Sequence, residues 1–233
     1  MSKKVVLLSG GLDSSTLLAS VRWDTGSEDV LAVNMYYGQR HDKEIESARR
    51  IADYYAVELM ELNLAEIFKK SDCSLLKQSD KEIPESTYAE QLKASNGKPV
   101  STYVPFRNGL MLSAAASIAV SIGADEVWYG AHADDAAGNA YPDCSEAFVN
   151  AINAAIYEGT GGAVTVKAPW INKHKADIVK TGLMLKVPYA LTWSCYEGGE
   201  KPCGRCATCI DRIKAFEANG AQDPLSYQGG TIW

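Results

Sequence analysis

The sequence predicts an α/β fold: an open parallel sheet with helices on both of its faces. Extended apolar runs and amphipathic stretches alternate through residues 5–64, and this alternation is typical of parallel strands joined by crossover helices. A glycine-rich turn at 9–15 follows the first apolar run and precedes apolar residues at helical spacing. Ligands of such sheets bind beyond the C-terminal ends of the strands, so this turn marks the expected ligand site.

Each expected element follows from its local pattern. Buried parallel strands are short and apolar, helices carry apolar residues on one face, and glycine or proline interrupts both. We expect Asp13 or Ser14 to cap the first helix and Asp143 to cap a later one. The expected strands span residues 5–8, 30–37, 56–64, 126–132 and 164–169, and the expected helices span residues 16–21, 39–55, 110–122, 145–157, 173–188 and 210–218.

The composition is that of a globular chain and argues against two classes of partner. Of the 233 residues, 46% are hydrophobic and 22% are charged, and the net charge is −6. Such a chain lacks the broad basic surface that nucleic acid requires. The longest mostly apolar stretch, 110–123, is too short to span a bilayer, and the start of the chain is too short for a signal peptide. We therefore expect a cytoplasmic protein with no nucleic-acid and no membrane partner.

The turn at 9–15 has the chemistry of a phosphate-binding loop. Gly10 and Gly11 let backbone N–H groups approach an anion closely. The hydroxyls of Ser9, Ser14 and Ser15 add donors, and the helix N-terminus adds partial positive charge. The expected ligand is a phosphate or pyrophosphate, and the alternative is an ordinary glycine turn before a helix.

The loop lacks the lysine of a Walker A motif and does not follow the G-x-G-x-x-G spacing. It resembles the S-G-G-x-D-S loop of the PP-loop ATP pyrophosphatases, which cleave ATP between its α- and β-phosphates and transfer AMP to a substrate oxygen. The resemblance places Asp13 near magnesium and pyrophosphate, and we expect Asp13 to be an exposed loop carboxylate. The expected ATP-binding residues are Leu8, Ser9, Gly10, Gly11, Leu12, Asp13, Ser14, Ser15 and Thr16.

Residues 68–105 interrupt the alternation of strands and helices. They contain three prolines and show little periodicity, and the segment is long for a connection within a compact domain. A lid or binding loop that becomes ordered when ligand binds accounts for this length. A flexible surface insertion is the alternative.

Two charged positions lie near the expected strand ends. Arg107 precedes an apolar helix, where its guanidinium can donate a fork of hydrogen bonds to phosphate or carboxylate; a surface salt bridge is the alternative. His132 follows the fourth strand together with Asp134 and Asp135. A base or a metal ligand is possible there, but a structural histidine is the preferred interpretation.

Cys195, Cys203, Cys206 and Cys209 cluster near the C-terminus, apart from the other two cysteines. In a chain whose thiols stay reduced, this spacing indicates a metal site rather than disulfides. Four thiolates form the closed tetrahedral set that structural zinc prefers, with no open position for catalysis. An iron–sulfur cluster is the rival assignment, and four unligated thiols are the remaining one.

Three further segments resemble motifs of the 7-cyano-7-deazaguanine synthase family. They are residues 191–206, the segment Tyr141-Pro142-Asp143-Cys144, and residues 104–108. Together with the loop at 9–15, they cover nearly the whole chain in the family's order, which makes the resemblance specific. Phe106 departs from the glycine expected in most members.

This resemblance implies a reaction and its cofactors. The substrate would be 7-carboxy-7-deazaguanine, an intermediate on the path to queuosine-type nucleosides. ATP with Mg²⁺ would adenylate its carboxylate, ammonia would displace AMP to give an amide, and a second ATP would convert the amide into the nitrile. Free ammonia is the expected nitrogen donor because the chain shows no glutaminase domain, and the zinc would be structural.

The resemblance also assigns roles to single residues. Lys175 matches a family lysine that contacts phosphate, and a solvated helix lysine is the alternative. The other candidates hold the substrate's carboxylate or its deazaguanine edge. The candidate substrate-binding residues are Arg107, Asn108, Asp143 and Cys144, and the candidate catalytic residues are Asp13, Ser14, Lys175 and Arg107.

The chain divides into an ATP-binding domain at 1–188, with the lid-like insertion at 68–105, and a zinc-binding helical segment at 189–233. Family members commonly form homodimers, so we expect one here. Three other functions remain open: a homologue that stops at the amide, a PP-loop enzyme that adenylates RNA, and a zinc module that merely binds nucleotide. The acidic composition argues against the second and the intact loop against the third.

Overall fold

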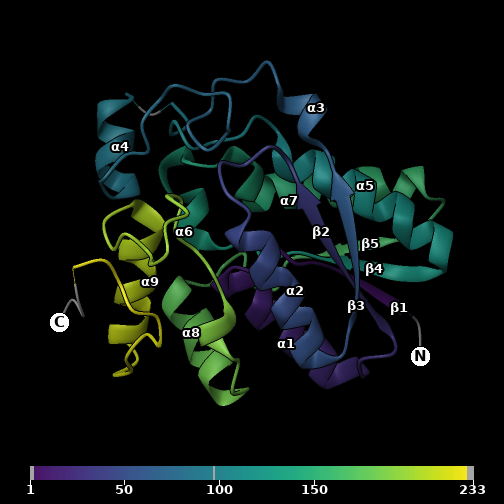
Figure 1. Ribbon diagram of the computed structural model, residues 1–233. Coiled ribbons are helices and arrows are strands. Elements are labelled where there is room, and N and C mark those ends of the chain that lie inside the picture. Colours follow the sequence, from purple (N-terminus) through teal and green to yellow (C-terminus); the bar gives the residue numbers. More distant parts are fainter. Residues whose placement is uncertain (1–2, 97, 230–233) are drawn as a thin grey trace.

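The computed structural model describes residues 3–96 and 98–229 and confirms the predicted fold class (Figure 1). Five parallel strands form one sheet in the order β3-β2-β1-β4-β5. Residues 1–2 and 230–233, at the ends of the two expected domains, lie outside the described residues. The strands are β1 (Lys3–Leu7), β2 (Val30–Tyr36), β3 (Glu58–Asn63), β4 (Ala124–Trp128) and β5 (Thr165–Lys167).

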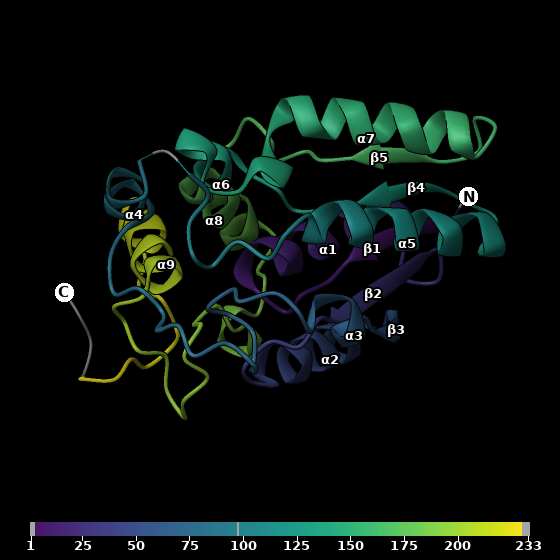
Figure 2. The same ribbon diagram turned by 90° about the horizontal axis from the view of Figure 1, so that it is seen from above.

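Helices cover both faces of the sheet (Figure 2). One face packs against α1 (Leu12–Thr25), α2 (Lys43–Tyr55) and α8 (Lys175–Met184). The other packs against α5 (Arg107–Ile122) and α7 (Glu146–Gly159). The remaining helical segments are α3 (Ala65–Phe68), α4 (Tyr88–Ala94), α6 (Ala133–Ala136), η1 (Ala137–Asn139), η2 (Pro142–Cys144), η3 (Tyr189–Leu191) and α9 (Ala207–Glu217).

The central strand β1 shows how the sequence builds two cores. Successive strand residues point to opposite faces of a sheet. Val5 accordingly packs with Leu112 of α5, and Val6 packs with Leu17 of α1, and both valines are fully buried. Full burial of such a side chain contributes about 1.5–3 kcal/mol. This strand therefore fixes the position of the loop that follows it.

The first capping prediction is wrong. Helix α1 begins at Leu12 with Gly11 as its N-cap, and no side chain caps it. Asp13 and Ser14 lie within the first turn instead. The Asp13 carboxylate is engaged by Lys175, and the Ser14 hydroxyl is engaged by Ser9. Neither side chain therefore acts as a local cap.

The second capping prediction is also wrong. Ser145, not Asp143, caps α7, and its Oγ accepts a hydrogen bond from the Phe148 N–H at 3.2 Å. Asp143 lies in η2, where its Oδ2 accepts a hydrogen bond from the Asn108 N–H at 2.9 Å. Asp143 therefore satisfies a free N–H in the first turn of α5.

The segment 68–105 is packed against the rest of the chain rather than standing free. Leu76 and Val104 are buried in a cluster with Tyr37, and Ile83 is buried against the C-terminal cysteines. Helix α4 begins with Thr87, which makes a capping box with Glu90. In both views α4 lies beside α9 (Figures 1 and 2). The segment therefore bridges the sheet and the C-terminal lobe, defined here as residues 189–229.

Phe106 has a backbone conformation that favours glycine. It lies immediately before α5 with a φ of 54° and a ψ of 27°, the left-handed region, which costs a non-glycine residue about 1–2 kcal/mol. Its ring packs edge-on against Phe148, with 6.0 Å between the ring centroids. The ring contact offsets part of this backbone strain.

We expect Phe106→Gly to be more stable than Phe106→Ala by about 1 kcal/mol, because both variants lose the ring but only glycine relieves the strain. Urea unfolding of the two variants measures the difference. The matched control is Phe148→Ala against Phe148→Gly inside α7, where glycine should be the less stable by about 1 kcal/mol. Equal stabilities at position 106 would contradict the strain argument.

The C-terminal lobe has its own buried anchor. Arg212 of α9 is 1% exposed and donates two hydrogen bonds to Asp223, at 2.6 and 3.0 Å. It also donates to Thr192 Oγ1 at 2.7 Å and to the Tyr189 carbonyl at 3.1 Å. Arg212 therefore joins α9 to the segments before and after it.

In the described ranges 3–96 and 98–229, no helix has both the length and the apolar character needed to cross a membrane.

Candidate active site

A cavity of about 220 Å³ lies where β1, β2 and β4 end. Its wall is formed by the loop at 9–15, the segment after β2, the first turns of α5, the turn after β4, and the C-terminal lobe. The carboxyl ends of neighbouring parallel strands meet at one edge of a sheet, which is why these distant segments converge. The sequence-based prediction of a site beyond the strand ends therefore coincides with a cavity.

Gly10 allows the loop to pack closely on α2. Its φ is +84°, and a Cβ atom at this position would overlap the Glu44 carbonyl oxygen and the Ala48 nitrogen. A side chain is therefore excluded both by the backbone conformation and by lack of space. The carbonyl of Gly10 accepts a hydrogen bond from the Trp193 N–H at 3.0 Å. The loop is thus held between α2 and the C-terminal lobe.

Serine hydroxyls brace the loop from within. Ser14 Oγ accepts a hydrogen bond from the Ser9 N–H at 3.2 Å and lies 3.0 Å from Ser9 Oγ. Ser9 Oγ also accepts a hydrogen bond from the Gly11 N–H at 3.3 Å. These contacts hold the loop open toward the cavity. Of the nine predicted ATP-binding residues, the wall contains Leu8, Ser9, Gly11, Asp13 and Ser14.

The other four predicted ATP-binding residues do not line the cavity. Gly10 packs on α2 as described above, and Leu12 is buried in the core under α1. Ser15 is fully buried, and Thr16 Oγ1 binds the Tyr189 hydroxyl at 2.8 Å. These residues shape the loop from behind.

Asp13 and Lys175 form an ion pair at the cavity wall. Asp13 Oδ2 accepts a hydrogen bond from Lys175 Nζ at 2.8 Å, and the Asp13 side chain is 24% exposed. The expectation of an exposed loop carboxylate is therefore wrong. Burial raises the pKa of Asp13, but Lys175 and His132 outweigh it and hold that pKa well below its usual range. Both groups stay charged at neutral pH, and the buried Asp13 Oδ1 has no partner among the described residues.

His132 lies behind this pair and is fully buried. Its Nε2 is 3.7 Å from Asp13 Oδ2 and 3.3 Å from Asp135 Oδ2. Burial lowers the pKa of His132, but the two carboxylates raise it above its usual value. His132 does not line the cavity, whereas Asp135 does. The histidine therefore lies behind the wall, next to two carboxylates, in keeping with the structural interpretation.

Asp134 fixes the start of α8. Its Oδ2 accepts a hydrogen bond from the Lys175 N–H at 2.8 Å, and its Oδ1 lies 2.7 Å from His174 Nδ1. Lys175 is the first residue of α8 and is 8% exposed. Two aspartates thus hold Lys175, one at its backbone and one at its ammonium group.

Arg107 and Glu44 face the cavity with opposite charges. The Arg107 guanidinium lies over the Tyr37 ring, with Cζ 4.8 Å from its centroid. Within residues 3–96 and 98–229, neither charged group has a hydrogen bond or an ion pair. Burial raises the pKa of Glu44 to about 7, although Arg107 acts in the opposite direction. Among the described residues, the cavity therefore offers an unpaired guanidinium and two carboxyl groups without an ion pair, those of Glu44 and Asp211, to a ligand.

The other predicted substrate-binding residues lie next to Arg107. Asn108 donates to Cys144 Sγ at 3.2 Å, and both residues line the cavity. Asp143 does not, because it is buried beneath the first turn of α5. Burial raises the pKa of Asp143, although Asn108 and Arg107 lower it. The Tyr129 hydroxyl is buried in the wall and has no partner among the described residues.

Three tyrosines join the insertion to the C-terminal lobe at the cavity. The hydroxyls of Tyr88 and Tyr196 lie 2.8 Å apart, and both side chains line the cavity. The Tyr141 hydroxyl lies 3.3 Å from that of Tyr196 and 2.6 Å from Thr102 Oγ1. An ion pair between Arg205 and Glu85 adds to this link. The segment 68–105 is therefore tied to the lobe across the mouth of the site.

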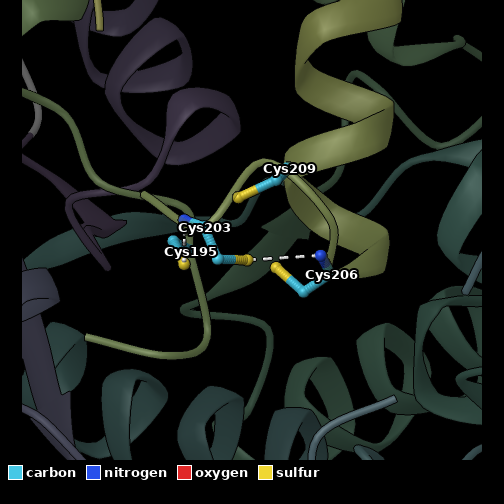
Figure 3. Close-up of side chains that lie close together, drawn as sticks. All are labelled: Cys195, Cys203, Cys206 and Cys209. Carbon is cyan, nitrogen blue, oxygen red and sulfur yellow. Dashed lines mark hydrogen bonds between the residues drawn. The ribbon is translucent and has the colours of Figure 1, made fainter. Parts of the chain in front are cut away.

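The four cysteines predicted to bind metal converge in the C-terminal lobe (Figure 3). All four are buried, none forms a disulfide, and their sulfur atoms lie within 4.8 Å of one another. Tetrahedral zinc with Zn–S bonds of about 2.3 Å places sulfurs about 3.8 Å apart, so the cluster fits such an ion. Cys195, Cys203 and Cys206 come from the loop before α9, and Cys209 lies within α9.

Backbone N–H groups point at the sulfurs. Cys195 Sγ accepts from Glu197 at 3.4 Å and from Cys203 at 3.3 Å, and Cys203 Sγ accepts from Cys206 at 3.3 Å. Such bonds stabilise thiolates and orient them around a metal. His41 Nε2 lies 3.0 Å from the Cys195 carbonyl, which ties the cluster to the segment that precedes α2. The cysteine cluster therefore joins the lobe to the segment that precedes α2.

Comparison with known proteins decides the family. The model of the family described as "Queuosine biosynthesis protein QueC" matches residues 3–220. The chain belongs to this family. A 7-cyano-7-deazaguanine synthase from Archaeoglobus fulgidus is 45% identical over 96% of this chain and 89% of its own length. Those from Caldicellulosiruptor bescii and Oceanobacillus iheyensis are 39% and 42% identical, over 99% and 97% of this chain and 100% and 98% of their own lengths.

A solved structure of the NH3-dependent NAD synthetase from Campylobacter jejuni matches 58% of this QueC family chain and 50% of the synthetase chain. The TM-score of this match is 0.38, and the two sequences are 19% identical. That similarity is too low to support an argument.

The sequence analysis missed several residues that line the cavity of this QueC family member, because they lie outside any motif. They are Tyr37, Glu44, Tyr88, Tyr129 and Asp211.

Proposed function

We propose that this chain converts 7-carboxy-7-deazaguanine, ammonia and ATP into 7-cyano-7-deazaguanine, with release of AMP and pyrophosphate. The observation that carries this proposal is the match with relatives named 7-cyano-7-deazaguanine synthase, which extends over nearly the full length of both chains. The cavity supports it, because an anion-binding loop, a buried ion pair and a free guanidinium face one space. The expected small-molecule partners are thus the acid, ammonia and ATP.

We propose that ATP binds with its phosphates at the loop 9–15. Loop N–H groups and the Lys175 ammonium would stabilise the charge that develops as pyrophosphate leaves. Asp13 Oδ1, which has no partner among the described residues, suits a magnesium ligand, since Mg²⁺ prefers carboxylate and phosphate oxygens. Magnesium would neutralise the leaving pyrophosphate. In this scheme Asp13 and Lys175 hold each other in place, and Ser14 keeps the loop open.

We propose that Arg107 holds the carboxylate of the acid. Its planar fork of donors matches a carboxylate, and its contact with the face of the Tyr37 ring holds the guanidinium in the cavity wall. Asn108 and Cys144 lie beside it and would contact the heterocycle. Asp143 is better suited to positioning Asn108 than to touching substrate, because its carboxylate lies beneath the first turn of α5.

The chemistry requires activation twice. A carboxylate oxygen is a poor leaving group, and transfer of AMP to it makes it a good one. Ammonia then displaces AMP and gives the amide. A second AMP transfer, to the amide oxygen, allows that oxygen to leave and gives the nitrile. One loop would serve both activations in sequence.

We propose that the four cysteines bind one structural zinc ion. Four buried thiolates with no open position suit structural zinc rather than catalysis. We further propose the division into an ATP-binding domain at 1–188 and a zinc-binding segment at 189–233. Residues 68–105 would close over the bound substrate, and the Tyr88–Tyr196 contact supports that role.

We also propose that the protein forms a homodimer. Exposed apolar side chains on α5 and α7, including Val120 and Tyr157, offer a surface for it. Light scattering on the purified protein tests this proposal, and a monomer mass at micromolar concentration would refute it.

The order of products tests the proposed function. With the acid, ammonium and limiting ATP, we expect the amide to appear before the nitrile, with about two AMP formed per nitrile by the two activations described above. Purified amide plus ATP should give nitrile without ammonium. Release of ADP in place of AMP would refute adenylation. If amide accumulates without dehydration, the protein is the amide-forming homologue and only the first half of the proposal holds.

A further inference from the structure

Glu44 is one of the cavity residues to which the scheme above assigns no task. It lies in the first turn of α2, and its carbonyl abuts Gly10 of the loop. Its side chain reaches the same cavity as Ser9 and Arg107. Glu44 therefore forms part of the wall of the cavity in which the acid would be adenylated.

Among the described residues no ion pair neutralises the Glu44 carboxyl group, although the charge of Arg107 favours its ionised form. Lys175 is paired with Asp13, and Lys43 Nζ lies over the Trp193 ring, 5.9 Å from its centroid. Arg107 faces the cavity but forms no ion pair within the described residues. A carboxylate removed from bulk water is costly unless a cation or donor meets it. The space next to Glu44 thus suits a small cation that donates hydrogen bonds.

The nature of that cation follows from the neighbours. A divalent metal prefers several oxygen ligands, whereas Glu44 is a single carboxylate with a guanidinium facing the same cavity. A monovalent donor of hydrogen bonds satisfies the site without competing with Arg107. Ammonium, which the proposed reaction consumes, has this charge and these donors.

We propose that Glu44 binds the ammonium ion and accepts its proton before the carbon–nitrogen bond forms. This inference rests on the proposed function. The Glu44 carboxylate takes one proton from ammonium and leaves neutral ammonia. The nitrogen lone pair then attacks the acyl carbon, the bond from that carbon to the AMP oxygen breaks, and AMP leaves with the electron pair. The nitrogen loses a second proton to water as the amide forms.

The test is Glu44→Gln, which keeps the shape of the side chain and removes its charge. With ammonium, we expect amide formation to fall at least about 100-fold, the usual effect of losing a general base. Pyrophosphate release from ATP and the acid without ammonium should stay within about 2-fold of wild type, since no proton is moved in that step. Hydroxylamine, which is uncharged near neutral pH, should still give the hydroxamate at close to the wild-type rate.

Glu46→Gln is the matched control, because Glu46 is an exposed carboxylate in the same first turn of α2. It should behave as wild type with both nucleophiles. Three results with Glu44→Gln would each overturn the assignment of Glu44. They are an equal loss of rate with ammonium and with hydroxylamine, a loss of pyrophosphate release, and an unchanged rate with ammonium. If the wild-type protein itself releases no pyrophosphate with the acid, the proposed function fails instead.

Discussion

Replacing Asp13 by asparagine should lower the rate of AMP formation at least about 100-fold, because it removes a carboxylate that would hold magnesium and that fixes the Lys175 ammonium. It should also destabilise the fold by about 1–3 kcal/mol, since Lys175 is left with a weaker partner in a buried place. Chromatography of the nucleotide products and urea unfolding measure the two effects.

Two variants separate the effect on activity from the effect on stability. Asp24→Asn changes an exposed aspartate of the same helix and should alter neither quantity. The double variant Asp13→Asn with Lys175→Met removes the buried charge and should recover stability without recovering activity. Recovery of AMP formation in the double variant would contradict a direct role for this pair.

Replacing Cys206 by serine should give unstable or insoluble protein. Metal binding to four thiolates is coupled to folding, and a serine hydroxyl is a poor zinc ligand. Elemental analysis of the wild-type protein should find one zinc per chain, and a chelator should lower its melting temperature. Cys73→Ser is the matched control, since Cys73 is also buried but lies outside the cluster.

Loss of the metal should also abolish AMP formation. Trp193 and Tyr196 flank the cluster and contact the loop or line the cavity. Disorder of the lobe would therefore remove one wall of the site. Iron and labile sulfide in place of zinc would overturn the assignment, and so would soluble, active Cys206→Ser protein.

The sequence predicted the sheet, the loop and the cysteine cluster because each is a local pattern. The residues Val5 to Leu8 form a short buried run, and only glycine permits the backbone of residue 10. The two x2 spacings of the cysteines favour one shared ion. Such features depend on neighbours within a few positions, so the chain displays them without its fold.

The parts that escaped prediction depend on contacts between distant segments. No motif includes Glu44, but the first turn of α2 lies against Gly10, and Glu44 lines the cavity. Asp13 was expected to be exposed because nothing near it in sequence reveals Lys175. Asp143 was expected to cap the next helix, yet it serves α5, whose first turn precedes it by about 35 positions. Tertiary partners overrode local preference in each case.

The hydrogen bond from Trp193 to Gly10 has a consequence for the order in which the protein is made. The loop leaves the ribosome early, whereas the residues that hold it from the other side emerge only after most of the chain. Contacts between such remote segments slow folding, because a long loop must close before they form. A nascent chain therefore carries an incomplete loop, and the cavity gains its last wall only after the lobe has been synthesised.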